Sequence, residues 1–275
     1  MVKIEWKKTL KESTVRLYDY QLGKYLNPLF GGKLFDMMTQ SDLTRLIEAT
    51  KDQKNDTPIF VLRGIIHQAE KLKVKCPNID FTKVQSKKGE SKKVFLSMEE
   101  ISLLLQQVSR ETKPFYVFLL GTGMRIGEAL AIDWLDVSVK EKTILIDKQY
   151  NSMAKKVTTT KSGKERVIPL SDMALQSLRM QAQLTGSEWL IKGPVFGNIK
   201  RWMIDKELKT VKSKKHITPH VLRHTFASML VQSGTSLETI SALLGHADLQ
   251  TTQIYTHFDT SRLKSAMQNL QKIDM

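Results

Sequence analysis

Several side chains that could act together on a phosphate group lie near the C-terminal end of the sequence. His220 and Arg223 are three positions apart, and His246 and Tyr255 follow further along the chain. His220 and Arg223 would share one face of a helix, and few acidic residues interrupt the series. Imidazoles, a guanidinium and a phenol in this order could hold an anionic phosphoryl group and deliver the tyrosine oxygen to it.

A second arginine lies in the glycine-rich motif Gly121-Thr-Gly-Met-Arg125-Ile-Gly-Glu128. A guanidinium group binds two phosphate oxygens in a planar fork and keeps its charge throughout a reaction, which favours arginine over lysine for this task. The glycines would let the backbone turn tightly around Arg125. Glu128, one helical turn later, would orient Arg125 or another basic group; an acid on the helix surface is the alternative.

These motifs resemble the tyrosine recombinases, a family that includes phage and transposon integrases and the Xer resolvases. The resemblance is most specific over residues 119–137, 157–170 and 217–258. The segment Leu-Gly-His246-Ala-Asp-Leu-Gln-Thr-Thr-Gln-Ile-Tyr255-Thr-His is Xer-like, whereas the region starting at Tyr25 is more similar to integrases. The resemblance implies a site-specific DNA recombinase that cuts and rejoins DNA through a 3′-phosphotyrosine intermediate and a Holliday junction, with no metal or other cofactor.

The resemblance also implies a role for each matched residue. Tyr255 would be the nucleophile, and Arg125 and Arg223 would clamp the scissile phosphate. His220 would accept the phenol proton, because the positive end of the helix dipole would keep its imidazole neutral. His246 would donate to the phosphate and support Tyr255, with a packing role as the alternative.

The remaining site predictions concern lysines in polar segments. Lys161 would protonate the leaving 5′-oxygen from the tip of a turn, and Lys164 is the alternative. A run of lysines in the predicted linker would contact DNA: Lys87, Lys88, Lys92 and Lys93. His220 and His224 have a spacing that could hold a metal, but no glutamate directly follows His220 and no cysteine is near, so we predict no metal site.

The pattern predicts a mainly α protein with a small β-sheet. Residues 1–84 would form a helical, SAM-like core-binding domain that binds DNA. Residues 85–94, which are almost wholly polar, would form a linker, although a solvated loop is the alternative. Residues 95–275 would form a mixed α/β catalytic domain, and the resemblance implies that the two domains close as a C-shaped clamp on DNA.

Within these domains the apolar spacing predicts individual elements. A capping box at Ser97–Glu100 begins a helix, and Thr218 caps a helix with Pro219 at its first position. Further helices are expected at 15–25, from about 41, at 58–72 and at 114–120, the first ending at Pro28 and the glycines after it. Strands are expected at 143–147, 157–160 and 166–169, and residues 161–164 would be the turn between the last two.

Composition supports a polyanionic partner. The net charge is +15, with 19 Lys and Arg against 11 Asp and Glu in residues 1–95, and 24 against 17 in residues 96–275. Both parts are basic, as expected if each grips a duplex. A single cysteine excludes an internal disulfide. No apolar run could span a membrane and no leader pattern is visible, so we expect a cytoplasmic, bacterial or phage-encoded protein at the nucleoid.

The tail from Ser261 to Met275 carries an apolar stripe. The resemblance implies that it docks onto a neighbouring protomer in a homo-tetramer on synapsed DNA; packing on its own domain is the alternative. A DNA-bending accessory factor is left open. So are the target sequence, the direction of reaction, the host element and the presence of a further N-terminal arm-binding domain.

Three rival functions fit part of this pattern. A type IB topoisomerase would share the chemistry without pairing two duplexes, but the Gly-His246 motif and the amphipathic tail favour recombination. A non-catalytic DNA-binding regulator would have no need of Tyr255. A basic RNA-binding protein would account for the charge alone.

Overall fold

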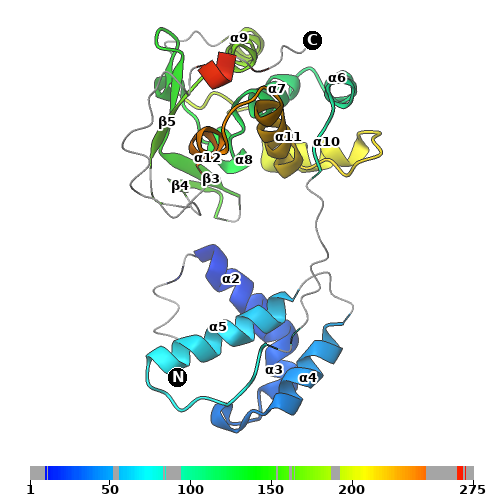
Figure 1. Ribbon diagram of the computed structural model, residues 1–275, viewed down its shortest axis with the longest axis vertical. Coiled ribbons are helices and arrows are strands. Elements are labelled where there is room, and N and C mark those ends of the chain that lie inside the picture. Colours follow the sequence, from blue (N-terminus) through cyan, green and yellow to red (C-terminus); the bar gives the residue numbers. More distant parts are fainter. Residues whose placement is uncertain are drawn as a thin grey trace. The chain divides into compact units, whose positions relative to one another are not determined.

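The computed structural model describes residues 10, 12–51, 56–82, 84, 94–152, 154–160, 163, 165–186, 193–245, 265–268 and 270. The chain divides into two compact units, residues 1–92 and residues 93–275 (Figure 1). The lysines of the predicted linker lie outside the described residues. The exact domain limits and the clamp-like arrangement therefore stay predictions.

The first unit is helical and has its own apolar core. Its elements are α2 (Glu12–Gln21), the π-helical turn η2 (Leu22–Leu26), α3 (Asn27–Phe30), the 3-10 turn η3 (Phe35–Met37), α4 (Gln40–Ala49) and α5 (Thr57–Lys71). The residues that pack at its centre come from four of these elements: Leu26, Phe30, Leu43, Leu46, Ile59, Val61, Leu62 and Ile66. Helical spacing predicted the start of α4 and both ends of α5 to within one residue.

Helical backbone extends beyond the predicted range of 15–25 and ends at the predicted glycines, so only Pro28 was wrong as an end signal. Pro28 lies in the first turn of α3, and the helix continues to Gly31, whose amide bonds the carbonyl of Asn27 at 2.8 Å. A proline is tolerated there because its missing N–H is not needed in a first turn. The π turn before it supplies the change of register that lets helical backbone continue.

The second unit packs seven helices, among the described residues, around one core. They are α6 (Met98–Gln107), α7 (Lys113–Thr122), α8 (Ile126–Ala129), α9 (Asp172–Thr185), α10 (Arg201–Thr210), α11 (Pro219–Gln232) and α12 (Leu237–Leu244). The predicted capping box begins α6: the Ser97 amide donates to Glu100 Oε2 at 2.7 Å, and the Glu100 amide donates to Ser97 Oγ at 3.3 Å. The predicted cap of α11 is also present, with Thr218 Oγ1 accepting from the Val221 amide.

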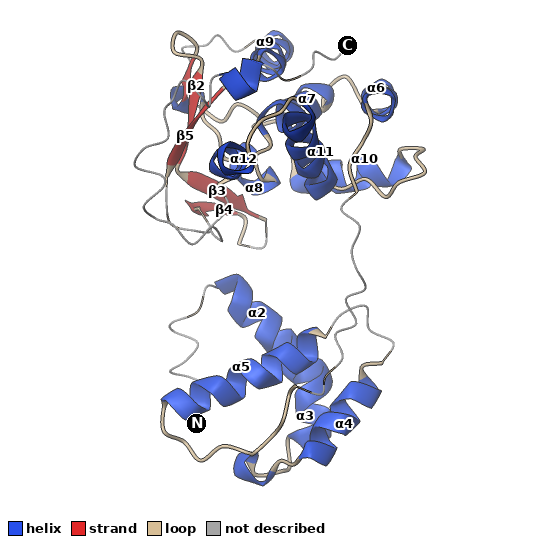
Figure 2. Ribbon diagram, in the orientation of Figure 1, coloured by secondary structure: helices blue, strands red, loops and turns tan. Residues whose placement is uncertain are grey.

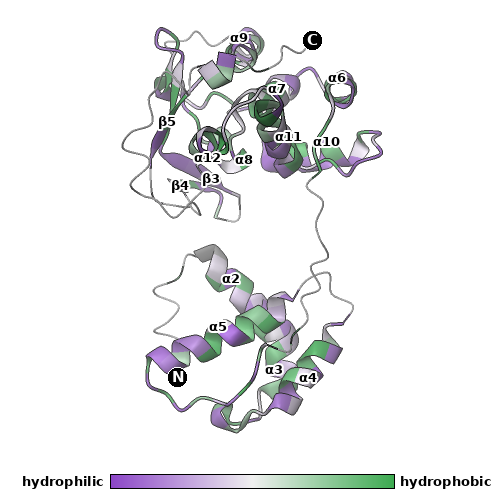
Figure 3. Cartoon of the chain, in the orientation of Figure 1, coloured by the Kyte–Doolittle hydropathy of each residue, from purple (hydrophilic) through white to green (hydrophobic). Residues whose placement is uncertain are grey.

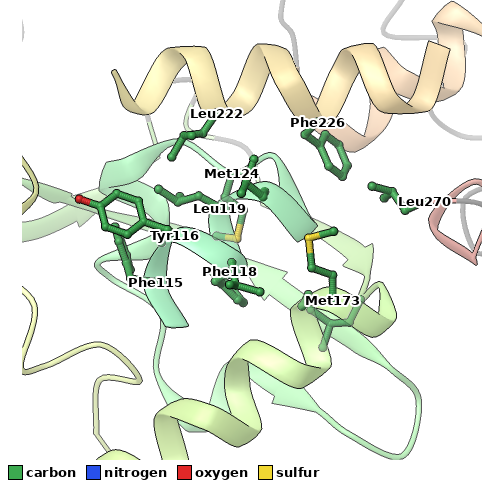
Figure 4. Close-up of a cluster of buried hydrophobic side chains, with 14 of the residues drawn as sticks. Phe115, Tyr116, Phe118, Leu119, Met124, Met173, Leu222, Phe226 and Leu270 are labelled. Atoms are coloured by element: carbon green, nitrogen blue, oxygen red, sulfur yellow. The ribbon is translucent and has the colours of Figure 1, made fainter. Parts of the chain in front are cut away.

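Helix α7 forms the centre of this core. Its residues from Pro114 to Thr122 are all buried, as expected for a helix that is apolar on every face. Phe115 and Phe118 both pack against Phe196, with ring centroids 5.0 and 5.1 Å apart. Figure 4 shows side chains of α7, α9 and α11 gathered around Phe118, and Figure 3 shows hydrophobic colour on α7 and α11.

Two small antiparallel sheets flank the helices (Figure 2). The first has the order β1 (Val137–Ser138), β2 (Thr143–Ile146), β5 (Arg166–Pro169), and the second pairs β3 (Lys148–Asn151) with β4 (Lys156–Thr159). The strands predicted on either side of segment 161–164 are present as β4 and β5, but the segment does not join paired strands. It connects the two sheets, because β4 pairs with β3, a polar strand that the apolar pattern does not reveal, whereas β5 pairs with β2.

The described part of the tail packs on its own unit. Residues 265–268 form a helical turn, and Ala266, Met267 and Leu270 are buried in the core of the second unit. These three residues of the stripe are thus covered within the same protomer, which is the alternative expected from the sequence. None of the described helices is long and apolar enough to cross a membrane.

Candidate active site

Arg223 is a buried arginine on the inner face of α11. The first turn of α11, fixed by Thr218 and Pro219, sets the direction in which this side chain points. Nη1 donates to the carbonyl of Gly123 at 2.8 Å, and Nη2 donates to the carbonyl of Leu244 at 2.7 Å. The guanidinium therefore joins the ends of α7 and α12 through carbonyl groups that would otherwise lack a partner.

The charge of Arg223 has no carboxylate directly beside it among the described residues. Burial, followed by repulsion from Arg125, lowers the pKa of Arg223 to about 9. The group is still a cation at neutral pH, but the folded protein holds that cation at a cost. A phosphate anion placed next to it would offset both the lost hydration and the repulsion.

Arg125 lies just before α8 and belongs to the same cluster. Its Nη1 is 2.9 Å from Oε1 of Glu128, and its Nη2 donates to the carbonyl of Gly245 at 3.2 Å. The side chain is 31% exposed, so part of the guanidinium can still reach a ligand. The left-handed conformation of Gly123, with φ of 63°, ends α7 and starts the turn to Arg125.

Glu128 is a buried carboxylate that serves two arginines. Besides Arg125, it binds Arg166 at the start of β5, with Nη2 2.7 Å from Oε2 and Nη1 3.3 Å from Oε1. Burial alone would raise the pKa of Glu128, but the hydrogen bonds and charge of Arg166, followed by those of Arg125, hold the pKa below its usual value. Glu128 is therefore ionised at neutral pH, and it aligns the guanidinium of Arg125.

Arg166 was not among the site residues predicted from the sequence. A charged residue at the start of a short strand usually lies at the surface, but this one is only 16% exposed. The signal that could have identified it is period-two alternation: Arg166 shares a strand face with Ile168, which is fully buried. An arginine on the buried face of a strand requires an acidic partner, and Glu128 is that partner.

The C-terminal end of α12 meets all three arginines. The Leu244 carbonyl accepts from Arg223, and the Gly245 carbonyl accepts from Arg125. Gly245 has a left-handed φ of 63°, and a side chain there would lie only 3.0 Å from the guanidinium carbon of Arg166. The chain continues from this point toward His246 and Tyr255, so its starting position is fixed by the arginine cluster.

The other predicted site residues are placed as follows. His220 is exposed in the first turn of α11, and His224 is exposed one turn later. The remaining ones lie outside the described residues: His246, Tyr255, Lys161 and Lys164, together with the linker lysines 87, 88, 92 and 93. In the described ranges, no group of three or more His, Cys, Asp or Glu residues could hold a metal ion.

The sequence matches a known family over most of the second unit. Residues 94–262 match the model of the phage integrase family. This match covers more than half of the chain, which therefore belongs to the phage integrase family.

Two curated relatives are Xer tyrosine recombinases. The chain is 33% identical over 215 residues to tyrosine recombinase XerD of Rickettsia prowazekii, an alignment covering 69% of this chain and 66% of the relative. It is 27% identical over 282 residues to tyrosine recombinase XerA of Pyrococcus horikoshii, covering 96% of this chain and 89% of that protein. The chain thus spans slightly less than two thirds of the bacterial relative that it matches.

Solved structures share the fold across both units. The Tn1549 transposon integrase in complex with transposon right end DNA aligns with a TM-score of 0.73 and 18% identity, covering 96% of this chain and 91% of that one. A lambda integrase tetramer bound to a Holliday junction aligns with a TM-score of 0.65 and 16% identity, covering 92% and 78%. At these identities the likeness establishes the fold, which is mainly α with small sheets, as predicted.

Proposed function

We propose that this protein is a site-specific DNA recombinase that cuts and rejoins DNA through a covalent 3′-phosphotyrosine. The observation that carries the proposal is the arginine cluster of Arg125, Arg166 and Arg223. Glu128 pairs with Arg125 and Arg166, whereas Arg223 is bound by main-chain carbonyls. The excess positive charge of the cluster suits a phosphodiester. Membership of the phage integrase family and the net charge of +15 support the same substrate.

Arg125 and Arg223 would bind the two non-bridging oxygens of the scissile phosphate. Arg223 is fixed by two carbonyls and Arg125 by Glu128 and Gly245, so both would act without reorganising as negative charge develops. Preorganised donors of this kind typically contribute about 3 kcal/mol each to transition-state stabilisation. Both groups remain cations throughout the reaction.

Tyr255 would attack the phosphorus while His220 accepts the phenol proton. The bond from phosphorus to the 5′-oxygen would break, and Lys161 would donate a proton to that oxygen, with Lys164 as the alternative donor. The products are a phosphotyrosine at the 3′ end and a free 5′-hydroxyl. Attack of a 5′-hydroxyl from a partner duplex would release Tyr255, and a second exchange would resolve the Holliday junction.

The working assembly would be a homo-tetramer on two synapsed sites in the cytoplasm. The lambda integrase structure is a tetramer bound to a Holliday junction, which supports this proposal by fold likeness. The tail would dock in trans within that assembly after leaving the position that it occupies in the single chain. The linker lysines would follow the duplex backbone, and a DNA-bending accessory factor would act only if the sites require it.

The proposal is tested with supercoiled plasmid that carries the DNA flanking this gene. The plasmid is incubated in EDTA with the wild type, with Tyr255→Phe and with Tyr150→Phe, a matched control on strand β3. We expect an SDS-stable, protease-sensitive adduct and recombinant products from the wild type and the control, and neither from Tyr255→Phe.

Other outcomes lead to other functions. An adduct with plasmid relaxation but no strand exchange would replace recombination with topoisomerase action. Tight DNA binding without an adduct would favour a non-catalytic regulator, provided that the plasmids together carry every flanking segment. An adduct that persists in Tyr255→Phe would assign the nucleophile to a different residue.

A further inference from the structure

Four groups around the candidate site form a closed ring of contacts. Arg166 binds both oxygens of Glu128, and Glu128 Oε1 also accepts from Arg125 Nη1 at 2.9 Å. Arg125 donates to the Gly245 carbonyl at 3.2 Å. Gly245 closes the ring, because its Cα faces the Arg166 guanidinium so closely that an added Cβ would be 3.0 Å from Cζ and Nε.

The ring joins three elements that are distant in sequence. Arg166 is paired with Ile146 in the sheet of β1, β2 and β5, Glu128 lies in α8, and Gly245 ends α12. The sheet register therefore fixes the position of the Arg166 backbone independently of either helix. A displacement of Arg166 would move Glu128 and the Gly245 turn together.

Arg166 is also poorly satisfied for a residue with a purely structural role. Its Nε is buried and has no hydrogen-bond partner among the described residues. A buried donor without a partner typically costs about 1–3 kcal/mol, whereas an apolar pair in place of Arg166 and Glu128 would avoid that cost. An arginine suits this position for another reason. Its guanidinium can bind the Glu128 carboxylate through two nitrogens and pack against Gly245 at the same time.

We propose that Arg166 is a positioning residue for the strand-cleavage reaction. It holds Glu128 in the orientation that directs Arg125 at the phosphate, and Arg125 in turn binds the Gly245 carbonyl, from which the chain proceeds to Tyr255. This inference rests on the proposed function and adds to it a residue that acts through Arg125. Arg166 itself need not touch the phosphate.

The charge balance supports action through Arg125 rather than direct binding. Both terminal nitrogens of Arg166 are engaged by the carboxylate of Glu128, which balances the charge of Arg166, whereas those of Arg223 bind neutral carbonyls. The side chain of Arg166 is 16% exposed. Arg125, in contrast, is 31% exposed and directs only Nη1 to the carboxylate. Arg125 is therefore the guanidinium of this pair that faces the ligand, and Arg166 supports it through Glu128.

The test compares Arg166→Lys with Arg125→Lys and with the double variant. A lysine keeps the charge but cannot bind both oxygens of Glu128 and lie against Gly245. We expect Arg166→Lys to slow adduct formation on the plasmid by about 10- to 100-fold, as small misplacements of catalytic groups do, with an unchanged Kd for DNA. In the Arg125→Lys background the same change should cost less than about 3-fold, because its effect passes through Arg125.

A matched control is Arg201→Lys. Arg201 also binds an acid through two oxygens, with Nε 2.9 and 3.0 Å from those of Asp205, but it lies on α10 outside the cluster. This variant should cleave DNA at the wild-type rate. Equal slowing in Arg201→Lys and Arg166→Lys would overturn the proposal. So would a double variant of Arg166→Lys and Arg125→Lys whose fold-loss equals the product of the fold-losses of the two single variants.

A second measurement needs no DNA site. Inorganic phosphate, at constant ionic strength set with chloride, should raise the Tm of the wild type and raise it several-fold less in Arg166→Lys and in Arg125→Lys. An unchanged phosphate response in Arg166→Lys would overturn the proposal even if no recombination site were found. Failure of the proposed function would appear differently, as a wild type that binds phosphate yet forms no Tyr255-dependent adduct.

A second variant keeps both measurements possible if Arg166→Lys does not fold. Arg166→Gln, which keeps donors for Glu128 without the charge, would then take its place in both measurements. If neither variant folds, Arg166 serves only to neutralise Glu128, and the proposal is wrong.

Discussion

Arg223 donates a hydrogen bond from Nη2 to the main-chain oxygen of Leu244, at 2.7 Å. Leu244 is the last residue of α12, so a side chain proposed to bind phosphate also holds the helix that precedes Tyr255. The second bond of Arg223, to Gly123, ties the same guanidinium to the end of α7. In the proposed function, substrate binding and placement of Tyr255 would therefore be coupled at Arg223.

Replacement of Arg223 by lysine should damage both stability and cleavage. An ammonium group cannot reach the Gly123 and Leu244 carbonyls in the geometry of the guanidinium fork. Loss of a partner for these buried groups should cost about 2 kcal/mol in the free energy of unfolding. Urea denaturation measures this cost, and the adduct assay measures the loss of cleavage.

Arg179→Lys is the control for this prediction, because Arg179 is exposed on α9. It should leave the free energy of unfolding and the cleavage rate unchanged. If Arg223→Lys proves as stable as Arg179→Lys, the two carbonyl bonds do not support the ends of α7 and α12.

Glu128 should give the protein a specific dependence of stability on pH. Its pKa in the folded state lies below the ordinary value of 4.5, in spite of burial, because of Arg166 and Arg125. A depressed carboxyl pKa contributes stability that is fully present above the unfolded pKa and is lost as pH falls through the folded pKa. Urea midpoints measured from neutral pH downward should therefore decrease in the wild type.

Glu128→Gln should be less stable at neutral pH and lose less stability on acidification, since it has no carboxyl to protonate. The exposed Glu111 provides the control variant Glu111→Gln, which should follow the wild-type pH profile. Parallel profiles for wild type and Glu128→Gln would mean that the two arginines do not depend on the ionised carboxylate.

Local signals in the sequence predicted much of this fold, and long-range pairing accounts for most of what was missed. The Ser97–Glu100 box and the Thr218 cap were predicted correctly because a helix start is determined by neighbouring residues. Strand β3 was missed because its residues are polar and half-buried. Without β3, the sequence pattern could not show that β4 pairs with β3 and β5 with β2.

The candidate site shows the same limit. Motif spacing identified Arg125, Glu128 and Arg223, which the fold brings together, because each belongs to a short motif. Arg166 could not be identified in this way, since its role depends on contacts with Glu128 and Gly245 that only the folded sheet creates. Whether His246, Tyr255 and Lys161 join this cluster stays a prediction.

Gly123 should tolerate no side chain. Its φ of 63° is unfavourable for any L-residue, and an added Cβ would lie 2.3 Å from Cδ1 of the buried Phe226. Left-handed backbone alone should cost about 1 kcal/mol, and overpacking should add about 1–3 kcal/mol. Thermal or urea unfolding of Gly123→Ala measures the sum.

Gly186→Ala separates the two costs, because Gly186 has a φ of 65° and nothing within 4 Å of an added Cβ. It should show only the backbone term. Phe226→Leu in the Gly123→Ala background should recover part of the overpacking term. Equal losses in Gly123→Ala and Gly186→Ala would show that the core around Phe226 yields without cost.

Met267 tests whether the tail packs on its own protomer in the absence of DNA. It is 2% exposed in the core of the second unit, next to Ala266, whereas Gln268 is exposed on the same helical turn. Removing a buried methionine side chain should cost about 2–5 kcal/mol, so Met267→Ala should lower the free energy of unfolding of the DNA-free monomer, and Gln268→Ala should not. Because the contact lies within one chain, this loss should be independent of protein concentration. A loss that appears only at concentrations where the protein self-associates would instead assign Met267 to a contact between protomers.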